Sequence, residues 1–428
     1  MTLAQEEAAA RAVLDAAWTR LPEKLRAPNQ FLGRHYAGCG ATIGAMPKCD
    51  FSCTGCYLGA DANRVRPKPL SEIKEQLETI RAWLGPAGNV QITDGEVSLR
   101  DESEVIEIIA HARSLGLVPM LMSHGETFRR RSGLLERLME RGGLTEISIH
   151  IDTTQRGRRD GYAQAKTELE LDGLRDEFAG MIRTARTRTG RRLEAASTVT
   201  VSRNNLDGVP GIVRWFLANA DAFKMLSFQP LAEVGRTEQA LKGVQPDELW
   251  ERIACGAGDP AIRRGEGWLG HSACTRFVQG LAVRRGDGVK FVPLYRRDQA
   301  DEMEVLGELM ARLGGASFRL DGQARAWRRV GRLLIQHGGF VVGRLLPQLV
   351  RLLRRAGSLR ANYFSIVSHH FMSASETATP LGQERLAACA FKVPINGQLQ
   401  SMCAVNALGL REEYYRQTPD STVATERL

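Results

Sequence analysis

The sequence predicts an α/β fold in which crossover helices join parallel strands, as in an open doubly wound sheet or a partial (β/α) barrel. Three observations lead to this prediction. From about Gly38, short apolar runs alternate with helical stretches, three cysteines directly follow the first run, and polar residues follow most later runs. Both fold types place ligands at the C-terminal ends of their strands, so we expect these cysteines and polar residues to share one site.

Six apolar runs of strand length are separated by stretches with helical periodicity. The predicted strands are Ala41–Met46, Val90–Thr93, Val118–Met122, Glu146–Ile151, Ala196–Val201 and Met225–Pro230. The predicted helices are Ser71–Leu84, Glu104–Leu115, Ser132–Arg141, Leu171–Thr189 and Val209–Ala220. Strands that alternate with helices in this way run parallel and are joined by right-handed crossovers.

The same alternation divides the chain into five regions. They are an N-terminal helix (1–35), the α/β core (36–236), a connecting region (237–320), Arg-rich amphipathic helices (321–360) and a C-terminal cap that contains cysteines (361–428). Within the connecting region, Leu281–Leu294 is predicted to form a short hairpin. The polar end, Gln417–Leu428, is expected to fray.

The chain carries a formal net charge of +9, and the excess is concentrated in one stretch. From Gly322 to Ser375 there are nine arginines and no acidic residue, which favours an acidic partner such as nucleic acid, an anionic membrane surface or a phosphorylated substrate. The first 18 residues have acids where a secretion signal has bases, and no window reaches the roughly 20 apolar residues of a spanning helix. We therefore expect a cytoplasmic protein whose eight reduced cysteines bind metal.

Cys49, Cys53 and Cys56 form a C-x3-C-x2-C pattern directly after the first predicted strand. A tight loop of this kind brings three thiolates to three corners of one iron–sulfur cluster and leaves the fourth iron open to another ligand. The alternative is a zinc site, although zinc ribbons usually contain paired C-x2-C knuckles and only one such pair is present here. We therefore predict a 4Fe–4S cluster.

With this triplet, the sequence resembles the radical S-adenosylmethionine (SAM) superfamily over about residues 38 to 235. The resemblance implies a partial (β/α)6 barrel, here with a C-terminal extension of helices and a cysteine-containing cap. It also implies that SAM binds the open iron, that a donor such as ferredoxin or flavodoxin supplies an electron, and that a 5′-deoxyadenosyl radical abstracts hydrogen from substrate. Gly55 departs from the family pattern, which has an aromatic residue near the adenine, and we expect Tyr57 to make that contact.

The second motif, Asp94-Gly95-Glu96, follows the second predicted strand and resembles the family's G-G-E-P element. The resemblance implies that Asp94, Gly95 and Glu96 hold the SAM amino group. A carboxylate suits an ammonium donor, and glycine allows close backbone approach. The match is partial, because Asp94 replaces the first glycine and Val97 the proline. The alternative for such a triplet is an ordinary surface turn.

Later strand ends supply further candidates for the same pocket. They are Ser123, His150, Asp152, Arg203, Asn205 and Gln229. The resemblance implies that Asp152 lies near the SAM ribose and that a basic residue such as Arg203 meets the SAM carboxylate. We predict His150 as the catalytic residue, because an imidazole at a strand end can bind ribose or contact substrate. Each candidate could instead be a cap or a loop residue with satisfied hydrogen bonds.

Four other cysteines predict a second, auxiliary 4Fe–4S cluster. Residues 389–397 and 398–403 have the pattern of a hairpin, which brings Cys389 and Cys403 together. Cys274, with Cys39 or Cys255, supplies the remaining thiols. The alternative is a set of buried free cysteines, which are common and inert.

The tail also resembles a narrower radical SAM subgroup, which includes archaeal enzymes that couple lipid tails into tetraethers and relatives that methylate a pterin. The resemblance lies in Ser368–Met372, Cys389–Gly397, Met402–Asn406, Phe228–Pro230 and Gly235–Arg236. Other cysteines of that subgroup are absent here, since only Cys274 stands where a pair is expected. No cobalamin-binding signature is found, so a methyl donor is not assigned.

The Arg-rich region contains two amphipathic pieces, Arg325–Gln336 and Arg344–Arg355, separated by Gly338-Gly339. Basic amphipathic helices with Trp and Leu can lie on an anionic bilayer, so we expect peripheral contact with the inner face of the membrane. The alternative is a packed helical pair with a solvated arginine face. RNA is not favoured, because few aromatic residues lie among the arginines.

These observations predict a radical SAM enzyme that abstracts hydrogen from an unactivated C–H bond of a small-molecule or lipid substrate. The product would contain a new C–C bond or an alkylated carbon. One rival is a peptide-modifying radical SAM enzyme with an auxiliary cluster, for which no N-terminal peptide-docking domain is evident. The other is a non-catalytic iron–sulfur or zinc protein.

Overall fold

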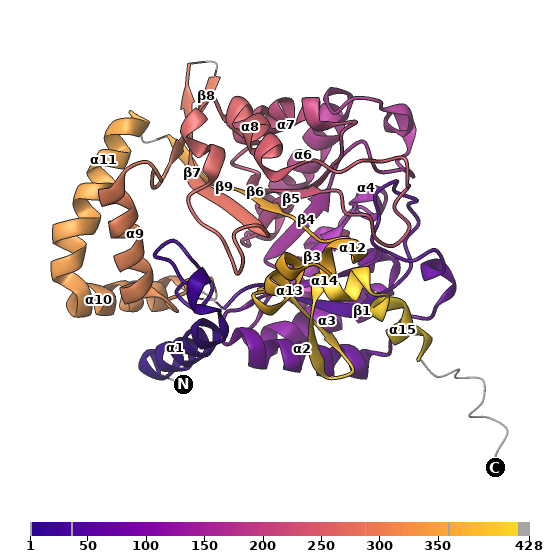
Figure 1. Ribbon diagram of the computed structural model, residues 1–428, viewed down its shortest axis with the longest axis horizontal. Helices are drawn as coiled ribbons and strands as arrows, with labels where there is room; N and C mark the ends of the chain where they lie inside the picture. Colours follow the sequence, from indigo (N-terminus) through magenta and orange to yellow (C-terminus); the bar gives the residue numbers. More distant parts are fainter. Residues whose placement is uncertain (1, 36, 287, 320, 358–359, 418–428) are drawn as a thin grey trace, which may run out of the picture.

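The computed structural model describes residues 2–35, 37–286, 288–319, 321–357 and 360–417, and one eleven-stranded sheet runs through it (Figure 1). The strands are β1 (Gly40–Met46), β2 (Asn89–Asp94), β3 (Val118–Ser123), β4 (Glu146–His150), β5 (Glu194–Val201), β6 (Phe223–Pro230), β7 (Thr275–Arg285), β8 (Gly288–Pro293), β9 (Ala361–His369), β10 (Lys392–Ile395) and β11 (Gln398–Ser401). Their order across the sheet is β11-β10-β1-β2-β3-β4-β5-β6-β9-β7-β8. Asp287, at the predicted hairpin turn, and residues 418–428, which we expected to fray, lie outside the described residues.

Strands β1 to β6 are neighbours in chain order and all run parallel, which confirms the predicted α/β fold and its six core strands. The register places Ile92 beside Leu121 and Ile147 beside Ala195. Parallel strands in this order bring all their C-terminal ends to one edge of the sheet. The segments that follow these six strands therefore meet there, as the sequence predicted.

Helices cover the outer face of this sheet (Figure 1). Those of the core are α2 (Leu70–Leu84), α3 (Glu102–Ser114), α4 (Glu126–Arg130), α5 (Leu134–Arg137), α6 (Asp172–Thr189) and α7 (Val209–Ala218). In α2, for example, Ile73, Leu77, Ile80 and Leu84 recur at helical spacing and are buried against the sheet, because the helix is apolar on that side only.

The remaining helices lie outside the parallel core. They are α1 (Leu3–Arg20), α8 (Pro246–Ala257), α9 (Ala300–Leu313), α10 (Gln323–Phe340), α11 (Leu346–Ala356), α12 (Ala374–Thr377), α13 (Pro380–Ala387), α14 (Met402–Ala407) and α15 (Leu410–Arg416). In Figure 1, α9, α10 and α11 form an outlying layer beside α1, and α12 to α15 lie over the β1 side of the sheet. None of the described helices is both long and apolar enough to cross a membrane.

The sheet extends beyond the predicted core at both edges, so it crosses the region boundaries expected from the sequence. Strand β9 pairs parallel with β6 and antiparallel with β7, and the predicted hairpin forms as β7 and β8. At the other edge, β10 and β11 form the tail hairpin and β10 pairs with β1. Cys403 does not lie on the returning strand as expected, because β11 ends at Ser401 and α14 begins at Met402.

Candidate active site

The cysteine triplet lies on the loop after β1, at the edge where the parallel strands end. A backbone hydrogen bond from Ser52 N–H to the Arg156 carbonyl, 2.9 Å long, fastens this loop to the segment after β4. Cys49, Cys53 and Cys56 all line one cavity of about 200 Å³. The local sequence motif thus places three thiols around one space.

The environment of these thiols fits an iron–sulfur cluster. Burial raises the pKa of Cys49 to about 12 and raises the pKa of Cys53 further, and the neighbouring cysteines add to both shifts. A metal must therefore displace the thiol protons when it binds. Phe51 N–H already points at Cys49 Sγ from 3.4 Å, the kind of contact that stabilises a bound thiolate. Of the described cysteines, three line this cavity, which leaves one corner of a cluster open.

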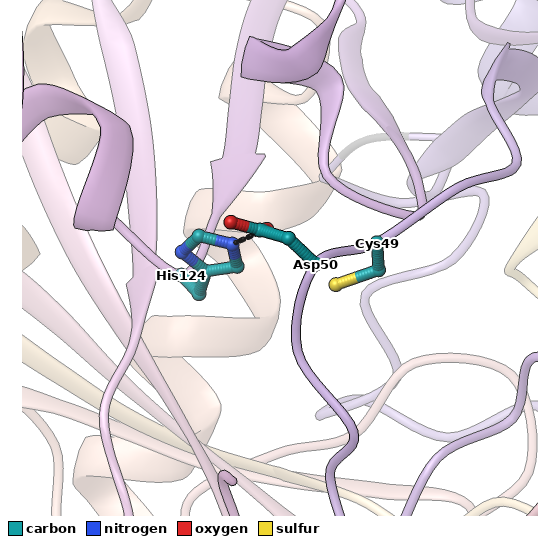
Figure 2. A group of neighbouring side chains, drawn as sticks. All are labelled: Cys49, Asp50 and His124. Atoms are coloured by element: carbon teal, nitrogen blue, oxygen red, sulfur yellow. Dashed lines mark hydrogen bonds and ion pairs between the residues drawn. The ribbon is translucent and has the colours of Figure 1, made fainter. Parts of the chain in front are cut away.

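Figure 2 shows Cys49 beside Asp50 and His124, whose ligand atoms lie within 4.8 Å of one another. The group is an alternative site for a single metal ion, but its imidazole is already engaged. His124 Nε2 lies 2.8 Å from the Asp50 carboxylate and 3.3 Å from that of Glu96. The imidazole also stacks on Phe51 with ring centroids 3.8 Å apart. His124 therefore clamps the cysteine loop to the end of β3, a role that the sequence analysis did not assign.

The turn after β2 packs directly against the cysteine loop. Gly95 N–H donates to the Met46 carbonyl at 2.6 Å, and Glu96 N–H donates to the Lys48 carbonyl at 2.8 Å. A Cβ at Gly95 would lie 2.1 Å from the Lys48 carbonyl oxygen, so glycine is required here. The buried Glu96 carboxylate accepts a hydrogen bond from Ser123 Oγ at 2.8 Å. It also accepts one from the backbone N–H of the residue after Ser123. Glu96 lines the cavity and also joins the ends of β2 and β3.

Asp94 lines the cavity, and its carboxylate is used by the C-terminal tail. It pairs with Arg411 and accepts a hydrogen bond from the Tyr415 hydroxyl, both on α15. Tyr57 donates to the Asp94 carbonyl at 2.6 Å, and the Arg411 guanidinium lies 4.7 Å from the Tyr57 ring centroid. The sequence analysis missed Arg411 and Tyr415, since 317 and 321 residues separate them from Asp94.

His150 lies at the end of β4 and lines the cavity, whereas Asp152 is turned away from it. The Asp152 carboxylate is 2.6 Å from His150 Nε2 and accepts hydrogen bonds from Thr154 and Thr200 N–H. Burial alone would raise the pKa of Asp152, but His150 and these donors outweigh it and hold the pKa below its usual value. Asp152 therefore orients the imidazole and does not itself reach the cavity where we expected the SAM ribose.

The other predicted residues divide into two groups. Ser123 and Gln229 line the cavity, as does Tyr57. Arg203 and Asn205 do not, because the chain turns away after β5 ends at Val201. Arg203 pairs with a surface glutamate, and Asn205 is buried and hydrogen-bonded within its own loop. The cation expected at the SAM carboxylate is therefore not Arg203.

Arg236, unlike Arg203, is among the residues that line the triplet cavity. Its backbone N–H donates to the Cys56 carbonyl at 3.0 Å and to the Leu58 carbonyl at 2.8 Å, which holds the residue beside the cysteine loop. Its Nε, and the Nε2 of Gln155 on the same cavity, are buried and have no hydrogen-bond partner among the described residues. Buried donors without partners are costly, so these two are suited to a bound ligand's carboxylate or hydroxyl.

The four other predicted metal ligands converge on a second, smaller cavity of about 50 Å³. Cys39, Cys274, Cys389 and Cys403 all line it, although they come from four separate segments. Burial raises the pKa of all four thiols, to about 11 for Cys39 and about 12 for Cys403. Arg385, itself buried, donates from Nε to Cys274 Sγ at 3.2 Å and so offsets part of that burial. Four thiols beside a guanidinium provide the number of ligands that a fully ligated cluster needs.

The strands also line a cavity away from the cysteine triplet. A third cavity, of about 620 Å³, lies toward the N-terminal ends of the strands and shares Gln91, Met120, Met225 and His369 with the triplet cavity. Many inward positions carry small side chains where closed barrels carry large branched ones. They include Ser148, Ala196, Thr198, Ser227 and Ser365. The side chains shared by the two cavities place these cavities next to each other along the inside of the sheet, and we refer to the two together as the lumen.

Comparisons with known proteins agree with this geometry. Residues 43–177 match the family model of the Radical SAM superfamily. A stretch of 200 residues is 24% identical to the 7,8-dihydro-6-hydroxymethylpterin dimethyltransferase of Methanocaldococcus jannaschii. This stretch covers 46% of the chain and 37% of that protein, so the match spans little more than a third of the relative.

Among solved structures, SuiB of Streptococcus suis is 13% identical and has a TM-score of 0.37, covering 50% of this chain and 44% of that one. The protein anSMEcpe with bound AdoMet is also 13% identical, with a TM-score of 0.36 over 50% of this chain and 57% of that one. These likenesses are too low to add to the argument, which depends on the family match, the cysteine triplet and the parallel sheet. Residues 43–177 thus form a radical SAM domain, the part of the chain that the family model matches.

Proposed function

We propose that this enzyme holds two iron–sulfur clusters and abstracts hydrogen from an unactivated C–H bond of an elongated, largely apolar substrate. One observation carries the proposal: the triplet cavity and the four-cysteine cavity adjoin, and His369, Phe371, Phe391 and Met402 line both. A substrate in the lumen would meet both sites at this junction. The product would contain a new C–C bond or an alkylated carbon.

The triplet cavity would hold the SAM-binding cluster through Cys49, Cys53 and Cys56. When bound, cluster and SAM together supply the 5′-deoxyadenosyl radical. The chain's own residues orient SAM and exclude water from it. Arg236 is the cation for its carboxylate, and His150, held by Asp152, presents its imidazole to the cavity.

The second cavity would hold the auxiliary cluster through Cys39, Cys274, Cys389 and Cys403. Its neighbour His369 also lines the lumen, and burial lowers the His369 pKa to about 4, so its imidazole is neutral at pH 7. A neutral imidazole can accept a hydrogen bond from a substrate held between the two cysteine sites.

The lumen favours a substrate with a long apolar part over a peptide. Its walls carry thioethers and small side chains, and its volume lies mostly away from the cysteine triplet. The tail resemblance to lipid-coupling enzymes points the same way. A second candidate is methylation of a pterin-like compound, favoured by the name of the Methanocaldococcus relative. A reaction with lipid extracts and with a dihydropterin, analysed for mass changes, separates the two.

The test of the two-cluster proposal counts iron in protein purified without oxygen. We expect about eight iron atoms per wild-type chain and about four after Cys49, Cys53 and Cys56 are replaced by alanine. The paired variant Cys274→Ala and Cys403→Ala should also hold about four, yet still cleave SAM. Cys255→Ala is the matched control, because Cys255 is exposed and lies in neither set. If the triple variant holds no metal, there is no second cluster.

A further inference from the structure

Helices α10 and α11 form one bent rod, kinked at His337, whose amphipathic character is opposite to that of an ordinary surface helix. Six of the arginines on this rod face the protein. Arg329 is buried and pairs with Glu6, Glu7 and Asp321, and Arg355 pairs with Glu302. Arg325, Arg332, Arg344 and Arg351 also pair with acids of α1, of α9 or of the residues just before α10. The alternative considered from the sequence, in which the arginine face is solvated, is therefore wrong for these six residues.

The apolar side of the rod faces outward instead. Ile335 is 87% exposed, Trp327 68% and Val342 66%. Leu334, Leu346, Leu349, Val350 and Leu353 are also exposed. A Cβ placed on Gly331, Gly338, Gly339 or Gly343 would meet nothing within 4 Å, so no described part of the chain covers this side. Contiguous apolar patches of this kind mark contact sites for proteins or membranes.

A π-helical turn lies between the two arms of this stripe. Val341–Leu345, between the two α-helices, has the wider i→i+5 turn. This turn takes up about one extra residue, which is a rotation of roughly 100° in an α-helix. It therefore changes which side of α11 faces outward, relative to an unbroken α-helix. The helix break at His337, where φ is −128°, lies one turn earlier and bends the rod, so that α11 runs at an angle to most of α10 (Figure 1).

We propose that this stripe, from Trp327 to Leu353, inserts shallowly into a lipid bilayer. Charge favours a bilayer over a second copy of the chain. Residues 322–375 contain no acid, and two arginines of the rod, Arg328 and Arg354, are exposed and form no ion pair with described residues. Such cations meet lipid phosphates when an apolar face lies at the interface, and they would repel each other across a symmetric contact.

The position of the rod links it to the lumen. Gly315, Ala316, Ser317 and Arg319, in the segment that leads into α10, line the 620 Å³ cavity. A bilayer on the stripe would therefore lie close in sequence to a segment that lines this cavity. That the cavity receives a substrate from the membrane rests on the proposed function, whereas the binding of the bilayer does not.

The experiment is vesicle flotation of the full-length protein, which needs no turnover. Vesicles of phosphatidylcholine with about 30% phosphatidylglycerol should carry wild-type protein upward, and the retained fraction should fall only modestly in high salt, because most arginines are used internally. Replacing Trp327, Ile335 and Val342 by Gln should lower the bound fraction by about tenfold or more. A matched control replaces Leu169 and Leu381, which are exposed apolar residues elsewhere, by Gln and should float like wild type.

Two outcomes would overturn the proposal. Wild-type protein that stays at the bottom of the gradient does not bind bilayers. Light scattering that shows a wild-type dimer and a monomeric Trp327/Ile335/Val342 variant would assign the stripe to a second copy of the chain. Circular dichroism and SAM cleavage of the variant establish that it is folded. Either outcome leaves the two-cluster proposal intact, because that proposal is tested by iron content.

Discussion

The two sets of cysteines are built in different ways. Cys49, Cys53 and Cys56 lie within eight residues on a single loop. The other set comes from four segments and depends on the tail, since Cys389 and Cys403 flank the β10–β11 hairpin that pairs with β1. A single loop brings the three cysteines of the triplet together. The four cysteines of the second set come together only when the C-terminal tail packs against the sheet. Substitutions in the cysteine loop and in the tail should therefore have different effects on the two cysteine sites.

The largest effect is expected from the loop itself. Cys53→Ala removes one of three thiols around the triplet cavity and should reduce SAM cleavage to background, with the second set still able to hold iron. Cleavage of SAM is measured as 5′-deoxyadenosine formed under reducing conditions. Cys255→Ala, at an exposed cysteine, should leave the rate unchanged. Undiminished cleavage by Cys53→Ala would show that the triplet does not bind the reactive cluster.

The next largest effect is expected from a substitution that disturbs both cysteine sets. Arg411→Met leaves the Asp94 carboxylate buried without its partner and should lower stability by about 3–5 kcal/mol. It also loosens the turn that packs on the cysteine loop, so SAM should bind more weakly to any folded protein. Arg183→Met is the control, because its pair with Asp221 is exposed and should be worth less than about 1 kcal/mol. Equal losses in the two variants, measured by denaturation, would mean that the buried pair does not hold the tail.

The comparison also explains what the sequence could predict. Strands β1 to β6 and the triplet were predicted, because apolar periodicity and short cysteine spacing are local signals. His124, Arg236 and Arg411 were not selected, since each acquires its role from a contact distant in the chain. The second set is intermediate: its cysteines were selected as candidates, but only the fold brings them to one cavity.

The sequence predicted where residues lie along the strands better than it predicted where their side chains point. Asp152 and Arg203 stand beside strand ends, as predicted, yet their side chains point to His150 and to the surface. The amphipathic pattern of α10 and α11 was also read correctly, but the sequence did not show that most of their arginines pair with acids of the chain itself. These acids lie mainly on α1 and α9, and no periodicity within the rod records them.

The smallest predicted effect concerns the second set alone. Glu266 lies at the start of the loop that carries Cys274, and its carboxylate accepts a hydrogen bond from Gln279 N–H at 3.0 Å. Its other oxygen is buried without a partner among the described residues. Burial raises the pKa of Glu266 to about 8, so the folded protein holds a proton that the unfolded chain releases near pH 4.5.

The sign of the pH dependence follows from that proton. The stabilising contribution of neutral Glu266 is complete below about pH 4.5 and is lost at about 1.4 kcal/mol per pH unit up to about pH 8. Glu266→Gln should remove this slope, so its denaturation midpoint should approach or exceed that of wild type as the pH rises from 6 to 8. Above pH 8, wild-type protein should lose iron from the second set first, because the loop with Cys274 is anchored by Glu266 while the triplet loop is not. Parallel stability curves for the two proteins would show that Glu266 does not titrate in this range, and the second set would then owe its stability to the docked tail alone.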